Sequence, residues 1–264
     1  MEQYIELNIW PDGTPEANGL SGAEDTSLPG FIANVSSPAL IVYPAENPSG
    51  KAIVMCPGGG LTKVAVGHEG HDMAEWFNQQ GITFGILKYR MPNGHKNVLL
   101  DDIQQSLQIM RQYKEEWRFT SLGVMGASIG GYIAASASVF TTADTRPDFQ
   151  ILFYPVISME DSITHINSRK QILGEQPDKE LIWAYSANLH VTKDTPPAFI
   201  TVAADDAAVS PENSLSYCQA LLENKVPVSL HVYPEGGHSF AFRESFPYRE
   251  ELMVELRKWL LGKK

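Results

Sequence analysis

Short apolar runs recur along the chain, and each of them predicts a buried β-strand. Gly, Pro or polar residues bound every run, as is usual for strands that are covered on both faces. The runs predict strands at residues 51–56, 82–89, 121–126, 150–154, 198–204 and 226–233. Two further apolar stretches, 4–10 and 38–43, have no helical segment between them. We therefore expect antiparallel strands at one edge of the sheet.

Helical patterns occupy the segments between several of these runs. Residues 98–117 carry apolar side chains at helical spacing, and Asp101 and Asp102 lie near their start, where acidic groups interact favourably with the helix dipole. Ser210 and Pro211 indicate an N-cap followed by a proline in the first helical position. The other predicted helices cover residues 130–140, 211–224 and 247–261.

The alternation of strands and helices defines the fold class. Such alternation needs crossover connections, which produce a mostly parallel sheet with helices on both faces. We therefore predict an α/β fold with a mostly parallel, twisted central sheet. Residues 157–195 interrupt the alternation with mixed polar, proline and aromatic content, and we interpret them as a small insertion over the C-terminal edge of the strands. Because the 264 residues contain no repeat and no clear linker, we expect a single domain over residues 1–264.

Composition and charge narrow the choice of partners. The chain has 20 Lys and Arg residues against 31 Asp and Glu residues, which gives a formal net charge of −11. A negative surface repels nucleic-acid phosphates and anionic lipid, so we expect neither nucleic acid nor a membrane as a partner. Two cysteines make no disulfide framework, and the N-terminus lacks the basic and apolar regions of a signal peptide. These features favour a cytoplasmic protein, unless a leader has been removed.

The strongest chemical signal is the motif Gly126-Ala127-Ser128-Ile129-Gly130. It fits Gly-x-Ser-x-Gly, and it follows a predicted strand and precedes a predicted helix. In this setting a sharp turn presents the serine at the helix N-terminus, and the glycines let the neighbouring chain approach. Ser128 is therefore a candidate nucleophile. The alternative is a glycine-rich turn with a capping serine.

A serine hydroxyl needs a base that a carboxylate orients, and both candidates occur later in the chain. Asp205 and Asp206 follow one predicted strand, and His238 follows the last one within a glycine-rich turn. We favour Asp206 as the acid because an apolar residue, Val209, stands three positions after it; Asp205 remains the alternative. His238 is favoured over the other histidines because none of them follows a late strand in a glycine-rich turn.

The loop Cys56-Pro57-Gly58-Gly59-Gly60 supplies candidate donors for an oxyanion. It leaves a predicted strand and carries few side chains, so its amides can point toward developing negative charge. We expect the amides of Gly59, Gly60 and Ile129 to form the oxyanion hole. The alternative is an ordinary glycine-rich loop.

Metal and cofactor motifs are weak in this sequence. His68-Glu69-Gly70-His71 spaces its histidines by three positions, whereas the zinc motif His-Glu-x-x-His spaces them by four. We interpret this segment as a solvated loop before a helix. The glycine loop lacks the lysine of a phosphate-binding loop and the later acidic residue of a dinucleotide fingerprint. We therefore expect no metal and no cofactor.

Together these residues resemble the α/β-hydrolase superfamily, and more narrowly the acetyl xylan esterase-like group, which is related to carboxylesterases and prolyl oligopeptidase-type hydrolases. The resemblance extends over nearly the whole chain. Besides the motifs above, it rests on Trp10-Pro11, Glu69-Gly70, Leu87-Lys88-Tyr89-Arg90, Asp102, Tyr154-Pro155-Val156-Ile157-Ser158, His165, Ser168, Thr195-Pro196-Pro197 and Pro211-Glu212-Asn213-Ser214.

The resemblance implies an α/β-hydrolase fold in which Ser128, Asp206 and His238 are nucleophile, orienting acid and general base. It implies a serine hydrolase of short-chain carboxylic esters, most of all a carbohydrate acetyl esterase, with a small-molecule or oligosaccharide ester as substrate. A general carboxylesterase, a prolyl oligopeptidase-type peptidase and a non-catalytic protein on the same fold are the alternatives.

The sequence departs from the family pattern at three positions. Leu61 stands where an aromatic residue is frequent, Ile129 where Ala is usual and Tyr132 where His is frequent. We hypothesise that the bulky Ile129 side chain narrows the acyl pocket. The insertion 157–195 is expected to shape the side of the pocket that receives the leaving group.

Overall fold

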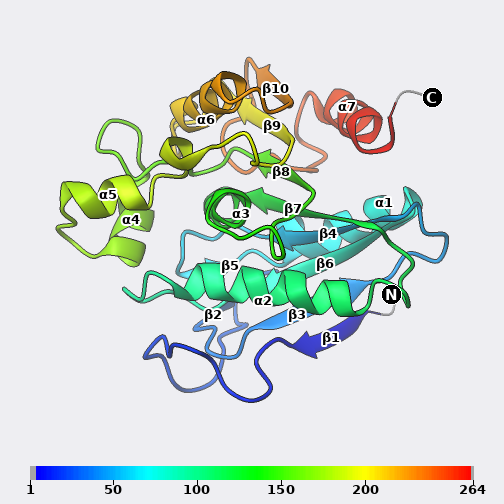
Figure 1. The fold of residues 1–264 in the computed structure, drawn as a ribbon, viewed down its shortest axis with the longest axis horizontal. Helices are drawn as coiled ribbons and strands as arrows, with labels where there is room; N and C mark the ends of the chain where they lie inside the picture. Colours follow the sequence, from blue (N-terminus) through cyan, green and yellow to red (C-terminus); the bar gives the residue numbers. More distant parts are fainter. Residues whose placement is uncertain (1–3, 263–264) are drawn as a thin grey trace.

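The computed structural model describes residues 4–262, and its centre is an eight-stranded sheet in the order β1-β3-β6-β4-β7-β8-β9-β10 (Figure 1). The strands are β1 Ile5–Asn8, β3 Ala39–Tyr43, β4 Lys51–Cys56, β6 Ile82–Lys88, β7 Ser121–Ala127, β8 Phe149–Phe153, β9 Ala198–Ala203 and β10 Val228–Tyr233. Neighbouring strands pair in parallel through β6, β4, β7, β8, β9 and β10, whereas β3 pairs antiparallel with β6 and β1 antiparallel with β3. The predicted mostly parallel sheet with antiparallel strands at one edge is confirmed. Residues 1–3, part of the N-terminal segment discussed above, lie outside the described residues.

A second, small sheet was not predicted. Strands β2 (Ile32–Ala33) and β5 (Lys63–Val64) pair in antiparallel orientation. Each has two residues, which is too short for any hydrophobic period to reveal. This pairing brings the segment after Phe31 beside the loop that follows β4, and so contributes to the site described below.

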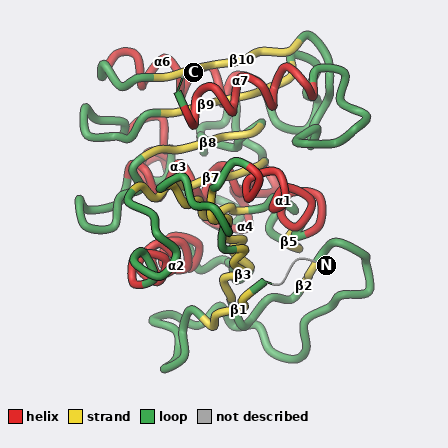
Figure 2. Tube along the Cα trace, turned by 90° about the vertical axis from the view of Figure 1, so that its right-hand side faces the viewer, coloured by secondary structure: helices red, strands yellow, loops and turns green. Residues whose placement is uncertain are grey.

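Helices cover both faces of the sheet. The turned view shows α1 and α7 on one face and α2, α3 and α6 on the other (Figure 2). The helices are α1 Asp72–Gln79, α2 Val98–Gln112, α3 Ile129–Val139, α4 Ile166–Leu173, α5 Lys179–Ala184, α6 Glu212–Glu223 and α7 Arg249–Leu261, with a π-helical turn at Gly67–His71 and a 3₁₀ turn at Ala187–His190. None of the helices in residues 4–262 has the length and apolar character that a membrane span requires.

The four predicted helices are present, and apart from the end of α2 their ends lie within two residues of the prediction. Helix α2 ends at Gln112 rather than at residue 117, and the ring of Trp117 folds back to stack on Tyr113 at 4.5 Å between centroids. Helix α6 begins one residue later than expected. Pro211 takes the N-cap position, and the Ser210 hydroxyl accepts a hydrogen bond from the Glu212 amide at 3.3 Å.

The core is continuous through the middle of the sheet. Strands β3, β6, β8 and β9 are buried along their whole length, whereas the outer strands β1 and β10 are largely half-buried or exposed. Both cysteines, Cys56 and Cys218, are buried and free, and burial raises the pKa of each thiol. Neither is therefore suited to act as a nucleophile, because the thiolate is the reactive form.

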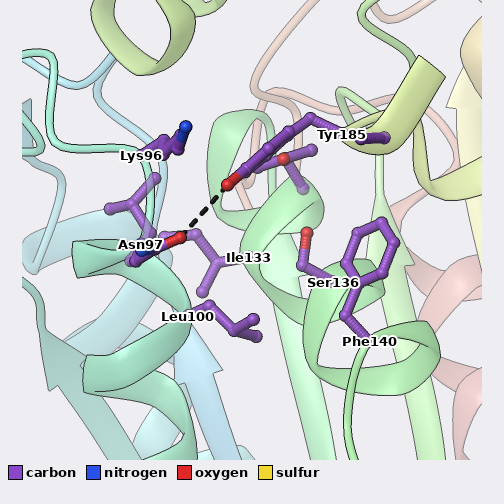
Figure 3. A pocket seen from close by; sticks show the side chains of 10 residues that line it. Lys96, Asn97, Leu100, Ile133, Ser136, Phe140 and Tyr185 are labelled. Carbon is purple, nitrogen blue, oxygen red and sulfur yellow. Dashed lines mark hydrogen bonds between the residues drawn. The ribbon is translucent and has the colours of Figure 1, made fainter. Parts of the chain in front are cut away.

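The insertion 157–195 contributes α4, α5 and the 3₁₀ turn. Helix α5 ends against α2 and α3, and the three helices enclose an apolar pocket of about 190 Å³ (Figure 3). Leu100, Ile133 and Phe140 line it, and the Tyr185 hydroxyl donates a hydrogen bond to Asn97 Oδ1 at 3.1 Å across its rim. Tyr132, which stands at a position where the resembled family frequently has His, also lines this pocket.

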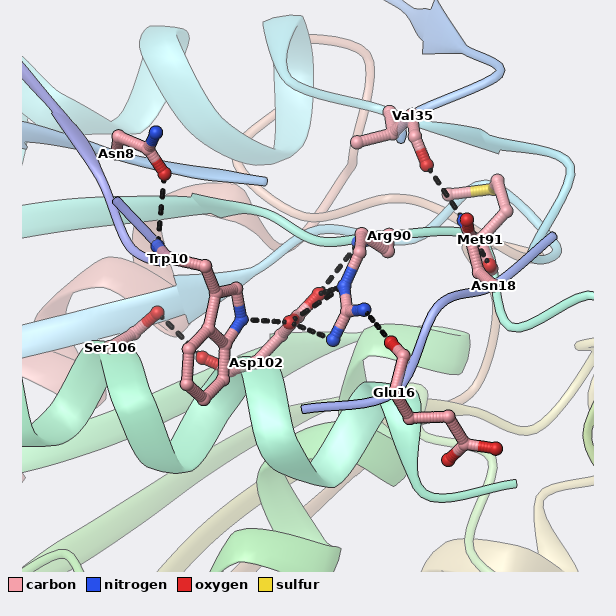
Figure 4. A network of polar contacts seen from close by, with 9 residues as sticks. All are labelled: Asn8, Trp10, Glu16, Asn18, Val35, Arg90, Met91, Asp102 and Ser106. Atoms are coloured by element: carbon pink, nitrogen blue, oxygen red, sulfur yellow. Dashed lines mark hydrogen bonds and ion pairs between the residues drawn. The ribbon is translucent and has the colours of Figure 1, made fainter. Parts of the chain in front are cut away.

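The segment between β1 and β2 is fastened to the domain by a buried ion pair (Figure 4). Arg90 Nη2 and Asp102 Oδ1 lie 2.7 Å apart, and both side chains are almost completely excluded from solvent. Trp10 Nε1 donates to the same carboxylate at 2.7 Å, and the Arg90 guanidinium donates to the Glu16 carbonyl. The pair therefore joins the N-terminal segment to the end of β6 and to α2.

Candidate active site

Ser128 stands at the turn between β7 and α3. Its backbone has φ 56° and ψ −124°, a conformation that non-glycine residues rarely adopt. The Ser128 amide donates to the Phe153 carbonyl at 3.0 Å, and the Ser128 carbonyl accepts from the amide of Val156 at 2.9 Å and from that of Gly131 at 3.0 Å. These bonds hold the unfavourable backbone in place, as functional turns require.

Two glycines permit this turn. A Cβ added to Gly126 would lie 2.1 Å from the Gly130 carbonyl oxygen, and one added to Gly130 would lie 1.9 Å from the Cys56 carbonyl oxygen. Any side chain at either position would push apart β4, β7 and α3. The Gly-x-Ser-x-Gly pattern therefore has a steric cause in this chain.

The structure brings Ser128, His238 and Asp206 into one chain of hydrogen bonds. Ser128 Oγ lies 2.8 Å from His238 Nε2, and His238 Nδ1 lies 2.7 Å from Asp206 Oδ2. The other Asp206 oxygen accepts from the amides of Ala208 at 2.9 Å and Val209 at 3.0 Å. An ionised carboxylate can only accept, so the fully buried Asp206 side chain accepts a hydrogen bond from Nδ1–H of His238, and this leaves Nε2 free to accept from the serine hydroxyl.

The neighbouring Asp205 has a different partner. Its Oδ1 accepts a hydrogen bond from the Gly237 amide at 2.8 Å, and so it ties the loop that carries His238 to the end of β9. Of the two carboxylates that the sequence left open, Asp206 is therefore the one in contact with the imidazole. Asp205 instead binds the backbone amide of Gly237, the residue before His238.

The glycine loop after β4 lies beside the serine. The Gly58 amide is occupied, because it donates to Glu69 Oε2 at 2.6 Å. Gly59 and Gly60 line the pocket in front of Ser128. Within residues 4–262, no carbonyl or side chain accepts a hydrogen bond from the amides of Gly59, Gly60 or Ile129. These three amides, which the sequence singled out, are thus available to an oxyanion.

Glu69 is the main residue of the site that the sequence analysis missed. Only 1% of its surface is exposed. Its Oε1 accepts from the Tyr154 hydroxyl at 2.9 Å and from the Ser239 hydroxyl at 2.8 Å, while its Oε2 holds Gly58. Burial alone would raise the pKa of Glu69, but His68 and the hydrogen bonds from Ser239 and Gly58 outweigh it, so that its pKa is lowered.

The expectation of a solvated loop at His68–His71 was wrong. These residues form the π-helical turn Gly67–His71, and Glu69 and Gly70 are buried within it. His68 Nε2 lies 3.1 Å from Ser239 Oγ, whereas His71 Nδ1 lies 2.6 Å from the Tyr43 hydroxyl. The two histidines therefore contact different partners: His68 contacts the loop after β10, and His71 contacts β3. Across residues 4–262, no group of three or more His, Cys, Asp or Glu side chains is arranged to hold a metal ion.

A pocket of about 290 Å³ opens in front of Ser128. The insertion contributes His165 to its wall. The remaining wall is formed by Phe31, Gly59, Gly60, Ala65, His68, Glu69, Ala208, Val209, His238, Ser239 and Arg243. The Ile129 side chain is not part of it, because that side chain is 1% exposed and belongs to the core. The structure therefore gives no support to an acyl pocket narrowed by Ile129. The apolar pocket between α2, α3 and α5 is separate and contains none of the three linked residues.

The chain is similar to a known protein family and to a curated protein. Residues 58–242 match the family described as alpha/beta hydrolase fold. The chain is 37% identical over 239 residues to an acetylxylan esterase from Xylanibacter ruminicola. This match covers 87% of the chain but 50% of the relative, so the chain spans half of that protein's length.

Solved structures with the same architecture include two relatives of similar size. An acetyl ester-xyloside bifunctional hydrolase from Caldicellulosiruptor lactoaceticus has a TM-score of 0.81 and 30% identity, with 97% of this chain and 95% of that chain covered. A sugar hydrolase from Lactococcus lactis has a TM-score of 0.73 and 26% identity, with 90% of this chain and 97% of that chain covered. The fold expected from the sequence is confirmed by these similarities.

Proposed function

Because the chain belongs to the α/β-hydrolase family, we propose that it is a serine esterase that removes acetyl groups from carbohydrate esters. The observation that carries this proposal is the unbroken hydrogen-bond chain from Asp206 through His238 to Ser128. Its distances fall within the range of about 2.6–3.2 Å in which a general base takes a proton.

The proposed reaction has two stages. In the first, Ser128 Oγ bonds to the ester carbonyl carbon while its proton passes to His238 Nε2, and the departing alcohol then takes that proton as the ester C–O bond breaks. In the second, a water molecule gives a proton to His238 and bonds to the acyl carbon. The carboxylic acid leaves, and Ser128 regains its proton. Asp206 holds the imidazole and stabilises its charged form, and the steps use only groups of the chain and water.

Charge develops on the carbonyl oxygen in both stages. We propose that the amides of Gly59, Gly60 and Ile129 stabilise it. One such donor is usually worth about 10²–10³ in rate. Glu69 supports this arrangement, because it fixes the Gly58 amide and thereby the start of the loop. A donor held in place before the reaction costs no reorganisation during it.

Two observations support an acetylated carbohydrate as the substrate. Two of the relatives are named for acetyl ester hydrolysis, and their names also include xylan or xyloside. The pocket of about 290 Å³ is small and carries polar side chains beside Ser128, which suits a short acyl group on a polar alcohol. We further propose that the chain acts as one catalytic domain, since the linked residues come from β7, β9 and β10 of one sheet.

A substrate panel tests this proposal. Release of acetate should be measured from acetylated xylan oligomers and other acetylated sugars, and release of 4-nitrophenol from 4-nitrophenyl acetate, butyrate and octanoate. A set of peptides should be added to the panel. We expect the highest kcat/KM on acetylated carbohydrate, lower values as the acyl chain lengthens, and no peptide cleavage. Faster turnover of octanoate than of acetate, or cleavage of peptides alone, would contradict the proposal.

A further inference from the structure

The catalytic pocket contains a second imidazole that the hydrolysis described above does not use. His165 precedes α4 in the insertion, where its side chain caps the helix, and it lines the same pocket as Ser128 and His238. The charges of His238 and Asp206 act on the His165 ring, although burial is the largest of the influences that lower its pKa. The ring thus shares a pocket with the catalytic groups, and its lowered pKa favours the neutral form.

Hydrogen bonds fix which nitrogen of His165 carries the proton. Nδ1 lies 3.4 Å from the Ser168 amide, which can only donate, and 2.8 Å from the Ser168 hydroxyl. Nδ1 is therefore the acceptor, and in the neutral ring the proton sits on Nε2. No described residue accepts a hydrogen bond from Nε2. The insertion thus presents one unpaired N–H donor at the wall of the catalytic pocket.

The substrate supplies the acceptor for this donor. In the proposed reaction the ester carbonyl oxygen faces the amides of Gly59, Gly60 and Ile129, and an acetyl group has no other oxygen beyond the ester itself. An additional acceptor therefore belongs to the alcohol half. Resting on the proposed function, we propose that His165 Nε2 donates a hydrogen bond to a hydroxyl or ether oxygen of the sugar that carries the acetyl group, and so selects carbohydrate acetates over acetates of plain alcohols.

The neutral state of His165 suits this role. During the reaction His238 becomes positively charged, and a second charged imidazole nearby would oppose that step. A neutral ring donates a hydrogen bond without this penalty. The selectivity therefore comes from one oriented donor, and an alcohol without a matching oxygen gains nothing from it.

Two acetates of similar shape test the inference. Methyl 2-O-acetyl-β-xylopyranoside carries free hydroxyls and a ring oxygen, whereas cyclohexyl acetate is also the ester of a secondary ring alcohol but has neither. The variant is His165→Asn, because Asn is a good N-cap that can still accept from the Ser168 amide but does not extend an N–H to the position of Nε2. Unchanged thermal unfolding and fluorophosphonate labelling verify that the fold and the nucleophile are intact.

We expect His165→Asn to lower kcat/KM on the sugar acetate about tenfold and to leave cyclohexyl acetate within about twofold of the wild type. Ser168→Ala should change the ratio in the same direction but less. An equal loss on both esters, or no change on either, would overturn the inference while the esterase stands. A wild-type protein that hydrolyses neither ester would overturn the proposed function, and this inference with it.

Discussion

At the scale of single residues, the two adjacent aspartates after β9 have different roles in the site. Asp206 contacts the imidazole and is fixed by two backbone amides, whereas Asp205 accepts a hydrogen bond from the Gly237 amide. Adjacent side chains after a strand point in different directions, so that one sequence motif supplies both an orienting acid and a loop support. The direction in which each side chain points therefore decides which aspartate orients the imidazole, and the sequence alone indicates this direction only weakly.

This division predicts different outcomes for two matched variants. Asp206→Asn should lower kcat about 10⁴-fold, because an amide does not hold His238 in the tautomer that accepts the serine proton. Asp205→Asn should lower kcat less than about tenfold, since it weakens one peripheral hydrogen bond. Steady-state kinetics on 4-nitrophenyl acetate measure both. Equal losses in the two variants would show that the assignment of the acid is wrong.

Ser128 and His238 could be singled out from the sequence because local patterns surround them. Gly126 and Gly130 announce the turn at the serine, and paired glycines precede the histidine. Glu69 has no such signal. Its three donors come from Gly58, Tyr154 and Ser239, which only the folded chain brings together. A functional residue can be predicted from the sequence when a local motif surrounds it, but not when its role depends on partners that are distant along the chain.

At the scale of elements, the site is a meeting of loops at the ends of parallel strands. The turn after β7 carries the serine, the loop after β9 the acid, and the loop after β10 the histidine. Glu69 joins the loop after β4 to the residues after β8 and β10. This buried carboxylate therefore sets the position of three loops relative to one another.

Glu69→Gln should disturb that arrangement. The amide offers one acceptor oxygen and places its NH₂ group among buried donors, which costs about 1–3 kcal/mol of stability. A small displacement of the oxyanion loop should also lower kcat by up to about 10²-fold, with little change in KM. Urea unfolding and kinetics measure the two effects. Glu75→Gln is the matched control on an exposed position of α1, and an effect of the same size there would contradict the assigned role of Glu69.

The Glu69→Gln variant also predicts how the free energy of unfolding depends on pH. The fold lowers the pKa of Glu69 below 4.5, so the ionised carboxylate stabilises the fold above that value. This contribution is lost as the pH falls through the lowered pKa. The difference in unfolding free energy between the wild type and Glu69→Gln should therefore shrink below pH 4.5. A difference that stays constant or grows on acidification would contradict a stabilising role of the ionised Glu69 carboxylate.

The regular elements were predictable, and the irregular ones were not. Strands such as β4 and β6 were expected within a residue or so of their ends, because continuous apolar runs between breakers mark buried strands. The short β2 and β5, the π-helical turn at Gly67–His71 and the helices α4 and α5 were not resolved from the sequence. Their positions depend on contacts with other segments, and they are too short to carry a periodic pattern of their own.

At the scale of the whole molecule, the N-terminal segment depends on one buried ion pair. Asp102→Ala would leave the Arg90 guanidinium and the Trp10 indole without their carboxylate in a site where 1% or less of either charged side chain is exposed. A buried charge that loses its partner costs about 3–5 kcal/mol. Lys258→Ala, in the exposed pair with Glu255, should cost about half a kcal/mol or less. Chemical denaturation compares them, and similar costs would contradict this account.

The central claim is that Ser128 is the nucleophile of a hydrolase whose triad is completed by His238 and Asp206. Its most direct test is a fluorophosphonate probe, with the labelled residue located by mass spectrometry in the wild type and in Ser128→Ala. We predict labelling at Ser128 alone in the wild type, and neither labelling nor ester hydrolysis in a variant that unfolds at the same temperature. Labelling at another residue, or hydrolysis that persists in Ser128→Ala, would contradict the claim.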